Sequence, residues 1–224
     1  MPMSPHAGEA PPVQRLQVVF GISGPARYIG SLDLTRAWVR ALRRLHVPLS
    51  YSHGFNPHAR LSVAAPLAVG FAGERELLEM HVDAVQDPTE LGLHLARQLP
   101  EGLTVRRVEE LPLAGPSLAA QVRAAAYVIS WPSPPADLAA RLQTLLAAAA
   151  LPYVRRRHDK QVRFDLRPRI IAATLRAGDR GPDLLLRLEH SPSGAARPED
   201  VLDALGLAPT GASIVRTGLL LGSQ

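Results

Sequence analysis

Hydrophobic and polar positions in the first part of the chain predict a buried strand followed by an amphipathic helix. The apolar run at residues 16–20 is typical of a buried strand. Ser31 is a candidate N-cap, and from there to His46 the apolar residues recur at helical spacing. These apolar positions are Leu34, Ala37, Trp38, Ala41, Leu42 and Leu45. The other face carries four arginines: Arg36, Arg40, Arg43 and Arg44. This pattern predicts a helix with one buried and one basic face.

The remainder of the first half continues the alternation of strands and helices. Strands are predicted at residues 61–65, 77–82 and 103–111, and a helix opens at Pro88 and runs to residue 99. Within 77–82, residues 77, 79 and 81 oppose 78, 80 and 82, as expected for a strand with one buried face. The element order βαββαβ is typical of a ferredoxin-like sandwich.

The second half partly repeats this order. Helices are predicted at residues 136–149 and from Pro198 to Leu205, and strands at residues 127–131, 153–157, 162–166, 170–176, 184–189 and 214–221. We therefore predict an α+β protein made of two ferredoxin-like (βαββαβ) sandwiches in tandem, the second with extra strands. The predicted domains are a flexible tail (1–13), a first half (14–113) and a basic second half (114–224).

Composition excludes several classes of chemistry. The 224 residues include no cysteine, which excludes disulfides, thiolate zinc sites, a cysteine nucleophile and protein-ligated iron-sulfur clusters. No run of 18 apolar residues and no signal-peptide pattern is present, so we expect a cytoplasmic protein without membrane contact. No cofactor is predicted.

The net charge of +5 is carried by arginine, since Lys160 is the only lysine. After residue 115, thirteen arginines and Lys160 face nine acidic residues. The densest basic run contains Arg155, Arg156, Arg157 and Lys160. Guanidinium groups suit phosphate, so this run predicts either a nucleic-acid contact or a solvated hairpin.

The segment at residues 51–60 is the strongest functional candidate, because it gathers rings, imidazoles, an amide and a guanidinium in one loop. As a nucleic-acid surface, Tyr51 and Phe55 would stack on bases and Asn56 would contact a base edge. Arg60, together with Arg27, would then bind phosphate.

Other interpretations of this segment remain open. As a catalytic loop, His53 and His58 would exchange protons near neutral pH. A metal site built on these two histidines would need a third ligand from distant sequence. Alternatively, the rings belong to the core and the polar groups only hold the loop in shape.

The glycine-containing turn at residues 21–30 lies just before the first predicted helix. Its spacing fits neither GxxxxGK[ST] nor GxGxxG, so it predicts an ordinary strand-to-helix turn. Arg27 lies beside the helix start, where it would assist an anion site.

Four segments make the chain resemble the radical-SAM-linked protein family: residues 25–29, 31–34, 51–58 with the sequence GFNPH, and 165–168. The resemblance implies a protein that occurs alone or fused behind radical-SAM enzymes, often encoded beside ribonuclease genes. It also implies an association with RNA processing or modification. Ala59 departs from the proline that many relatives carry. Without cysteines, this chain is not itself the radical-SAM catalyst.

These observations predict an RNA-associated accessory protein that acts alongside a radical-SAM enzyme, with RNA and that enzyme as partners. Two alternatives stay open. One is a protein adaptor subunit for a radical-SAM enzyme, and the other is a metal-independent RNA-processing enzyme that uses His53 and His58. The sequence therefore leaves open whether the chain is an enzyme.

Overall fold

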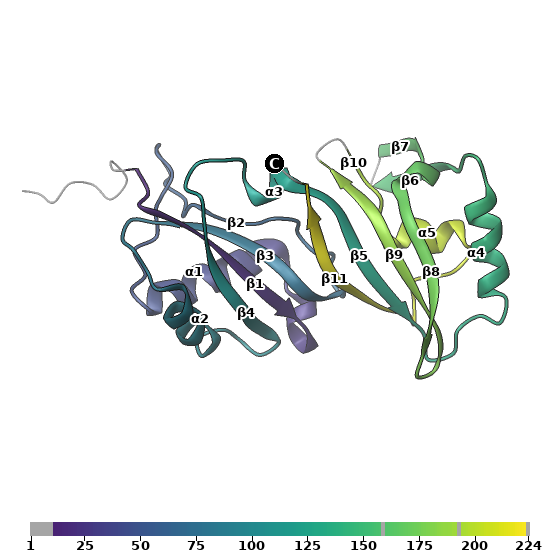
Figure 1. The fold of residues 1–224 in the computed structure, drawn as a ribbon, viewed down its shortest axis with the longest axis horizontal. Coiled ribbons are helices and arrows are strands. Elements are labelled where there is room, and N and C mark those ends of the chain that lie inside the picture. Colours follow the sequence, from purple (N-terminus) through teal and green to yellow (C-terminus); the bar gives the residue numbers. More distant parts are fainter. Residues whose placement is uncertain (1–10, 158–159, 192–193, 223–224) are drawn as a thin grey trace, which may run out of the picture. The chain divides into compact units, whose positions relative to one another are not determined.

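The computed structural model describes residues 11–157, 160–191 and 194–222. It shows a mixed α+β fold with two compact units that meet in the sequence between Gln121 and Val122. Figure 1 shows the elements of both units along the chain. Within the described residues, no helix is both long and apolar enough to cross a lipid bilayer.

The first unit is a four-stranded antiparallel sheet with two helices on one face. Its strands lie in the order β2-β3-β1-β4, and every neighbouring pair is antiparallel. The elements are β1 (Gln14–Ile22), the 3-10 turn η1 (Gly24–Tyr28), α1 (Ser31–Arg44), β2 (Leu61–Val63), β3 (Ala72–Val82), α2 (Pro88–Ala96), β4 (Leu103–Leu111) and α3 (Leu118–Gln121).

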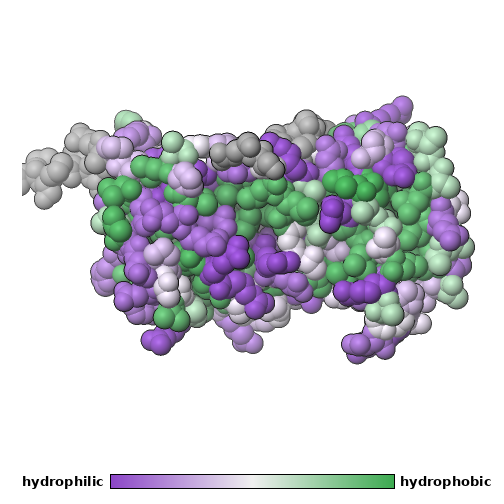
Figure 2. All heavy atoms as spheres, in the orientation of Figure 1, coloured by the Kyte–Doolittle hydropathy of each residue, from purple (hydrophilic) through white to green (hydrophobic). Residues whose placement is uncertain are grey.

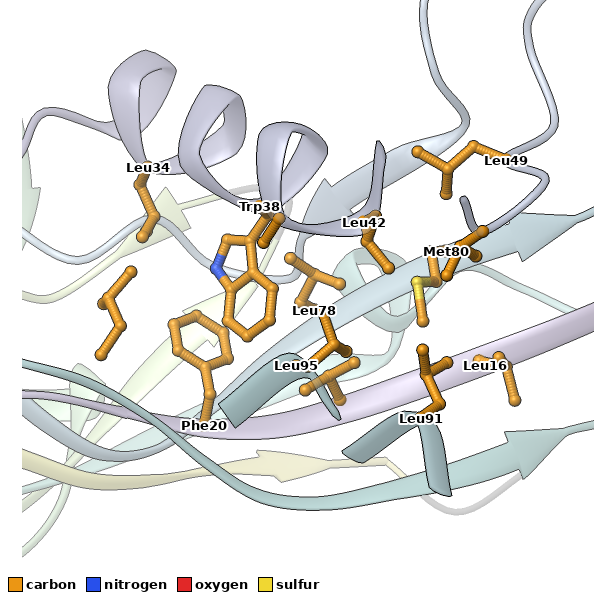
Figure 3. Close-up of a cluster of buried hydrophobic side chains, with 14 of the residues drawn as sticks. Leu16, Phe20, Leu34, Trp38, Leu42, Leu49, Leu78, Met80, Leu91 and Leu95 are labelled. Atoms are coloured by element: carbon orange, nitrogen blue, oxygen red, sulfur yellow. The ribbon is translucent and has the colours of Figure 1, made fainter. Parts of the chain in front are cut away.

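The core of this unit lies between the helices and the sheet, where alternate strand residues meet the apolar stripe of α1 (Figure 3). Phe20 of β1 and Trp38 of α1 form an edge-to-face ring pair with centroids 5.0 Å apart. Leu78 and Met80 of β3 are fully buried beside them. The apolar residues of α1 and β3 that the periodicity predicts to be buried therefore do face the core.

The opposite face of β3 is also buried, which the alternation of the sequence does not reveal. Arg15 and Glu79 form an ion pair there, 3.0 Å between Nε and Oε1. Arg15 also donates to the carbonyl of Pro116, and Glu79 accepts from the backbone N–H of Leu118. These bonds fasten Pro116 and Leu118, at the start of α3, to strands β1 and β3 of the first unit.

The described part of the second unit contains five antiparallel strands, β5 and β8 to β11, and a separate two-stranded hairpin. In this unit β11 pairs with β5, β5 with β9, and β9 with both β8 and β10. Among the strands that the structure describes, β6 and β7 pair only with each other. The elements are β5 (Val122–Ser130), α4 (Leu138–Ala147), β6 (Pro152–Arg157), β7 (Lys160–Asp165), the 3-10 turn η2 (Arg167–Arg169), β8 (Ile170–Gly178), β9 (Gly181–Ser191), β10 (Gly194–Ala195), α5 (Pro198–Ala204) and β11 (Ser213–Leu221).

One local prediction is wrong by a residue. The N-cap of α1 is Gly30 rather than Ser31, and Gly30 accepts the first helical hydrogen bond from Leu34 at 2.9 Å. Ser31 is the first helical residue, and no side chain caps this helix. The first turn of α1 therefore keeps backbone N–H groups without helical partners.

The outer edge of the first unit's sheet is polar. The strand β4 carries Arg106, Arg107, Glu109 and Glu110, and hydrophilic residues cover much of the first unit near β4 and α2 in Figure 2. Charged edges discourage pairing with strands of other molecules.

Candidate nucleic-acid interface

The candidate loop, residues 52–58, projects from a short backbone ladder between α1 and β2. Tyr51 pairs with Ala59 as an antiparallel bridge. Ser52 closes the loop by donating its N–H to the carbonyl of His58 at 2.8 Å, and its hydroxyl accepts from the N–H of His58 at 3.0 Å. The loop therefore has a defined base and a free tip.

The side chains at the tip are open to solvent. His53, Asn56 and His58 are exposed, and the ring of Phe55 is fully exposed. Gly54 has a φ of +127°, a backbone conformation that favours glycine, and a Cβ there would meet nothing within 4 Å. The alternative that the rings belong to the core is therefore wrong for Phe55.

Tyr51 behaves differently from Phe55. It is half-buried and packs against the core of the first unit, and its hydroxyl accepts a hydrogen bond from Arg43 at 2.9 Å. Tyr51 therefore fits the alternative in which the ring belongs to the core, because its ring supports the base of the loop. Arg43, near the end of α1, is brought to the loop by this bond.

The base of the loop is tied to β3 by backbone bonds through His81. Arg60 donates its N–H to the carbonyl of Ser50 at 2.7 Å, and His81 bonds to both residues through its own N–H and carbonyl. The Ser50 hydroxyl also bonds to the carboxylate of Asp83. The Arg60 side chain is exposed beside this anchor.

His81 itself is half-buried, and its pKa lies below the ordinary value of 6.5. Burial is the main cause, and the positive charge of Arg60 adds to it, whereas Glu79 opposes the shift. The lowered pKa favours the neutral imidazole, which keeps an added positive charge away from the anchor.

The sequence between residues 15 and 198 matches a family model described as uncharacterised proteins conserved in bacteria (DUF2344). The chain belongs to this family. The match includes the candidate loop and extends into both compact units. No curated protein matches the sequence. The family description contains no reference to radical-SAM enzymes, so that association remains a prediction.

Arg27, which the sequence groups with the loop, lies in the turn η1 of this DUF2344 member. Its Nε donates to the carbonyl of Gly70 at 2.9 Å, and the N–H of Gly70 donates back to the Arg27 carbonyl at 2.7 Å. These bonds hold the segment before β3, and the structure provides no bond between Arg27 and residues 52–58. Arg27 therefore belongs to a neighbouring feature of the same unit.

The basic run of the second unit does not present all its charges on one face. Arg155 is bonded to both carboxylate oxygens of Asp200 and to the carbonyl of Ala195, which leaves it little freedom to contact a phosphate. Arg156 is exposed on the opposite face, where Arg163 stands two positions from it across the hairpin. The side chains of Arg157 and Lys160 fall outside the part of the chain that the structure describes.

The chemistry available at the loop is that of recognition more than of catalysis. No carboxylate is hydrogen-bonded to His53 or His58 among the described residues, so neither imidazole has a partner that orients it. In the described ranges, no group of three His, Asp or Glu residues is arranged to hold a metal ion. What the loop offers is an open ring, two imidazoles and an amide.

Sequence reasoning missed Arg43 and His81 as neighbours of the loop. The sequence pattern places Arg43 on the basic face of the first helix and His81 in a strand with one buried face. Only the short segment at residues 45–50 separates the end of this helix from Tyr51, and that proximity in sequence was the available signal for Arg43. The position of His81 depends on strand pairing across a separation of more than 20 residues, which no local pattern encodes.

Proposed function

We propose that this chain binds single-stranded RNA through the loop at residues 52–58, as an accessory protein in RNA processing or modification. One observation carries the proposal, which is the fully exposed ring of Phe55 at the tip of a loop with a defined base. A large apolar side chain that stays in water forgoes the favourable free energy of burial. A base that stacks on the ring removes this apolar surface from water and recovers that free energy.

The residues around Phe55 suit a nucleotide better than an apolar partner. Asn56 carries both a donor and an acceptor for a base edge, and the imidazoles of His53 and His58 are flat rings with polar nitrogens. Two guanidiniums lie at the base of the loop: Arg60 is exposed, and Arg43 is bonded to Tyr51. Proteins that bind single-stranded nucleic acids combine aromatic rings that stack on bases with cations that contact phosphates. The rings at the tip of this loop and the guanidiniums at its base have the same arrangement.

We also propose that each unit is a ferredoxin-like sandwich. In the first unit the strand order β4-β1-β3-β2 supports this, since it is the fourth, first, third and second strand of a βαββαβ sequence. In the second unit β11-β5-β9-β8 follow the same rule once the hairpin β6-β7 and the short β10 are treated as insertions. Both sandwiches would then supply rigid sheets from which loops project.

The proposal is tested by truncating the exposed ring. Phe55→Ala is expected to weaken binding of a fluorescently labelled single-stranded RNA roughly 5- to 150-fold, because stacking contributes about 1–3 kcal/mol per base. Leu93→Ala is the matched control, since Leu93 is also a large exposed apolar residue of the first unit. Fluorescence anisotropy measures both affinities at one fixed salt concentration.

Equal RNA affinity of Phe55→Ala and the unaltered chain would overturn the proposal. An adaptor that docks on a radical-SAM enzyme predicts a different result. In that case Phe55→Ala would abolish co-purification of the enzyme from nuclease-treated extracts, and RNA affinity would not change. An RNA-processing enzyme predicts turnover of RNA that is lost in a His53→Ala, His58→Ala double variant with unchanged folding.

A further inference from the structure

A hollow with a volume of about 240 Å³ lies in the first unit between the start of α1, β2 and the segment at residues 66–71. We call it the α1 hollow. Leu34, Leu67 and Phe71 contribute apolar side chains to its lining, and Arg27 and Ser31 contribute polar groups. Pockets for drug-sized ligands hold about 300–1,000 Å³, so this hollow suits a smaller group.

Arg27 places a positive charge at the wall of the α1 hollow. Its Nε is fixed on the carbonyl of Gly70, and a guanidinium has five N–H donors. Within the described part of the chain, no other acceptor binds the remaining N–H groups of Arg27. The side chain is half-buried, so its charge is held in position and is partly shielded from bulk water.

The first turn of α1 adds to this positive wall. The helix has 14 residues, its N-cap is Gly30, and no side chain caps it. The one acidic residue of the first turn, Asp33, is paired with Arg36 at 3.0 Å, which offsets its negative charge. The helix start therefore supports anion binding beside Arg27 without supplying a site by itself.

Two exposed side chains lie at or next to residues that line the hollow. Leu32 lines the hollow and Tyr28 follows Arg27 directly, and both are exposed, at 73% and 68%. The Arg27 guanidinium lies 5.7 Å from the centre of the Tyr28 ring. A flat aromatic surface, an apolar floor and a fixed guanidinium together complement a base with an attached phosphate.

We propose that the α1 hollow binds one nucleotide of the RNA strand, with its base on the apolar floor and its phosphate at Arg27 and the first turn of α1. This inference rests on the proposed RNA-binding function and adds a second contact to it. The strand β2 lines the hollow and begins directly after Arg60 of the loop anchor. Arg43 at the loop and Ser31 at the hollow are separated along α1 by about 18 Å.

The test uses ribonucleoside 5′-monophosphates, with inorganic phosphate and the matching nucleosides as separate probes. Binding is followed by NMR chemical shifts of the full chain. We expect saturable chemical-shift changes at residues of the α1 hollow with the monophosphates. The changes with inorganic phosphate alone or with the nucleosides alone should be much smaller. Equal shifts with inorganic phosphate alone would overturn the nucleotide assignment.

Ser31→Glu is the decisive variant. A carboxylate in the first helical turn is favourable for the helix, so folding is retained, but it repels a phosphate at Arg27. Nucleoside monophosphate binding should weaken at least about tenfold, the scale of one lost charge-assisted hydrogen bond. Thr89→Glu is the matched control, because Thr89 is an exposed residue in the first turn of α2 in the same unit.

The outcomes separate this inference from the proposed function. Suppose that Phe55→Ala weakens binding of single-stranded RNA while Ser31→Glu changes neither RNA nor mononucleotide binding. The proposal that the α1 hollow binds a nucleotide is then overturned, and the proposed RNA contact at the loop stands. If Ser31→Glu weakens both RNA and mononucleotide binding and Phe55→Ala weakens neither, the proposed RNA contact at the loop is overturned. The nucleotide site in the α1 hollow then stands. Loss of RNA affinity in both variants, with Thr89→Glu unaffected, supports both contacts.

Discussion

A single ring distinguishes the candidate site at the scale of residues. Phe55 lies exposed at the loop tip, whereas the neighbouring ring of Tyr51 packs against the core and bonds to Arg43. The two aromatic residues therefore have different roles: Tyr51 supports the base of the loop, and Phe55 is exposed and free to contact a partner. Truncation of Phe55 therefore tests recognition with little effect on stability.

His81 gives a prediction about pH. Its pKa is lowered below 6.5, first by burial and then by Arg60. The unfolded chain therefore takes up the proton first as the pH falls. The stabilisation associated with neutral His81 is full above pH 6.5 and is lost as the pH drops through the lower folded value.

Titration of the His81 imidazole by NMR measures this directly, and we expect a midpoint below 6.5. His81→Gln should make the free energy of unfolding less dependent on pH in acidic solution. A midpoint at or above 6.5 would contradict the described burial and the influence of Arg60.

The β6-β7 hairpin shows how one element is attached at the next scale. Arg155 pairs with Asp200 of α5, and the Phe164 ring has the guanidiniums of Arg155 and Arg169 at 4.9 and 4.5 Å from its centre. Tyr153 donates its hydroxyl to Asp203 at 3.0 Å, and its pKa is raised by burial and by this carboxylate. The hairpin is therefore fastened to α5 by side chains.

Asp200→Asn should lower the free energy of unfolding by about 1.5–3 kcal/mol, because Arg155 loses its charged partner in a mostly buried position. Asp203→Asn is the control on the same helix, where the lost charge is exposed and the effect should be smaller. Chemical denaturation measures both. Equal destabilisation by the two variants would contradict the larger contribution assigned to the buried Arg155–Asp200 pair.

Local periodicity predicted the elements because it directly records which side chains face a core. The apolar stripe of α1 and the alternation of β3 correspond to observed burial. The pattern did not show that the other face of β3 is buried, since Arg15 and Glu79 acquire their partners from residues 116 and 118. Long-range polar contacts of this kind leave no periodic trace in the sequence.

The candidate loop was predictable because its unusual composition is confined to ten neighbouring residues. The grouping of Arg27 with that loop was an inference from charge alone, and the structure instead bonds Arg27 to Gly70. Likewise, a run of neighbouring arginines does not reveal its internal partners, as Arg155 illustrates. Geometry was needed to separate available charges from those already paired.

Across the whole molecule, the net charge of +5 is not a measure of free basic surface. In the second unit, Arg141 pairs with Asp137, Arg176 with Asp183 and Arg155 with Asp200. The surplus charge would give general attraction to a polyanion, and the specific contact that we propose lies at the exposed groups of the first unit. The central claim is therefore that single-stranded RNA contacts the loop at residues 52–58.

Ultraviolet crosslinking of the full chain to single-stranded RNA, followed by tryptic digestion and mass spectrometry, tests that claim most directly. Cleavage after Arg44 and Arg60 releases the entire loop in one peptide, residues 45–60. We predict that this peptide carries the main crosslink and that Phe55→Ala removes it. Crosslinks confined to other peptides, with none in residues 45–60, would contradict the proposed interface.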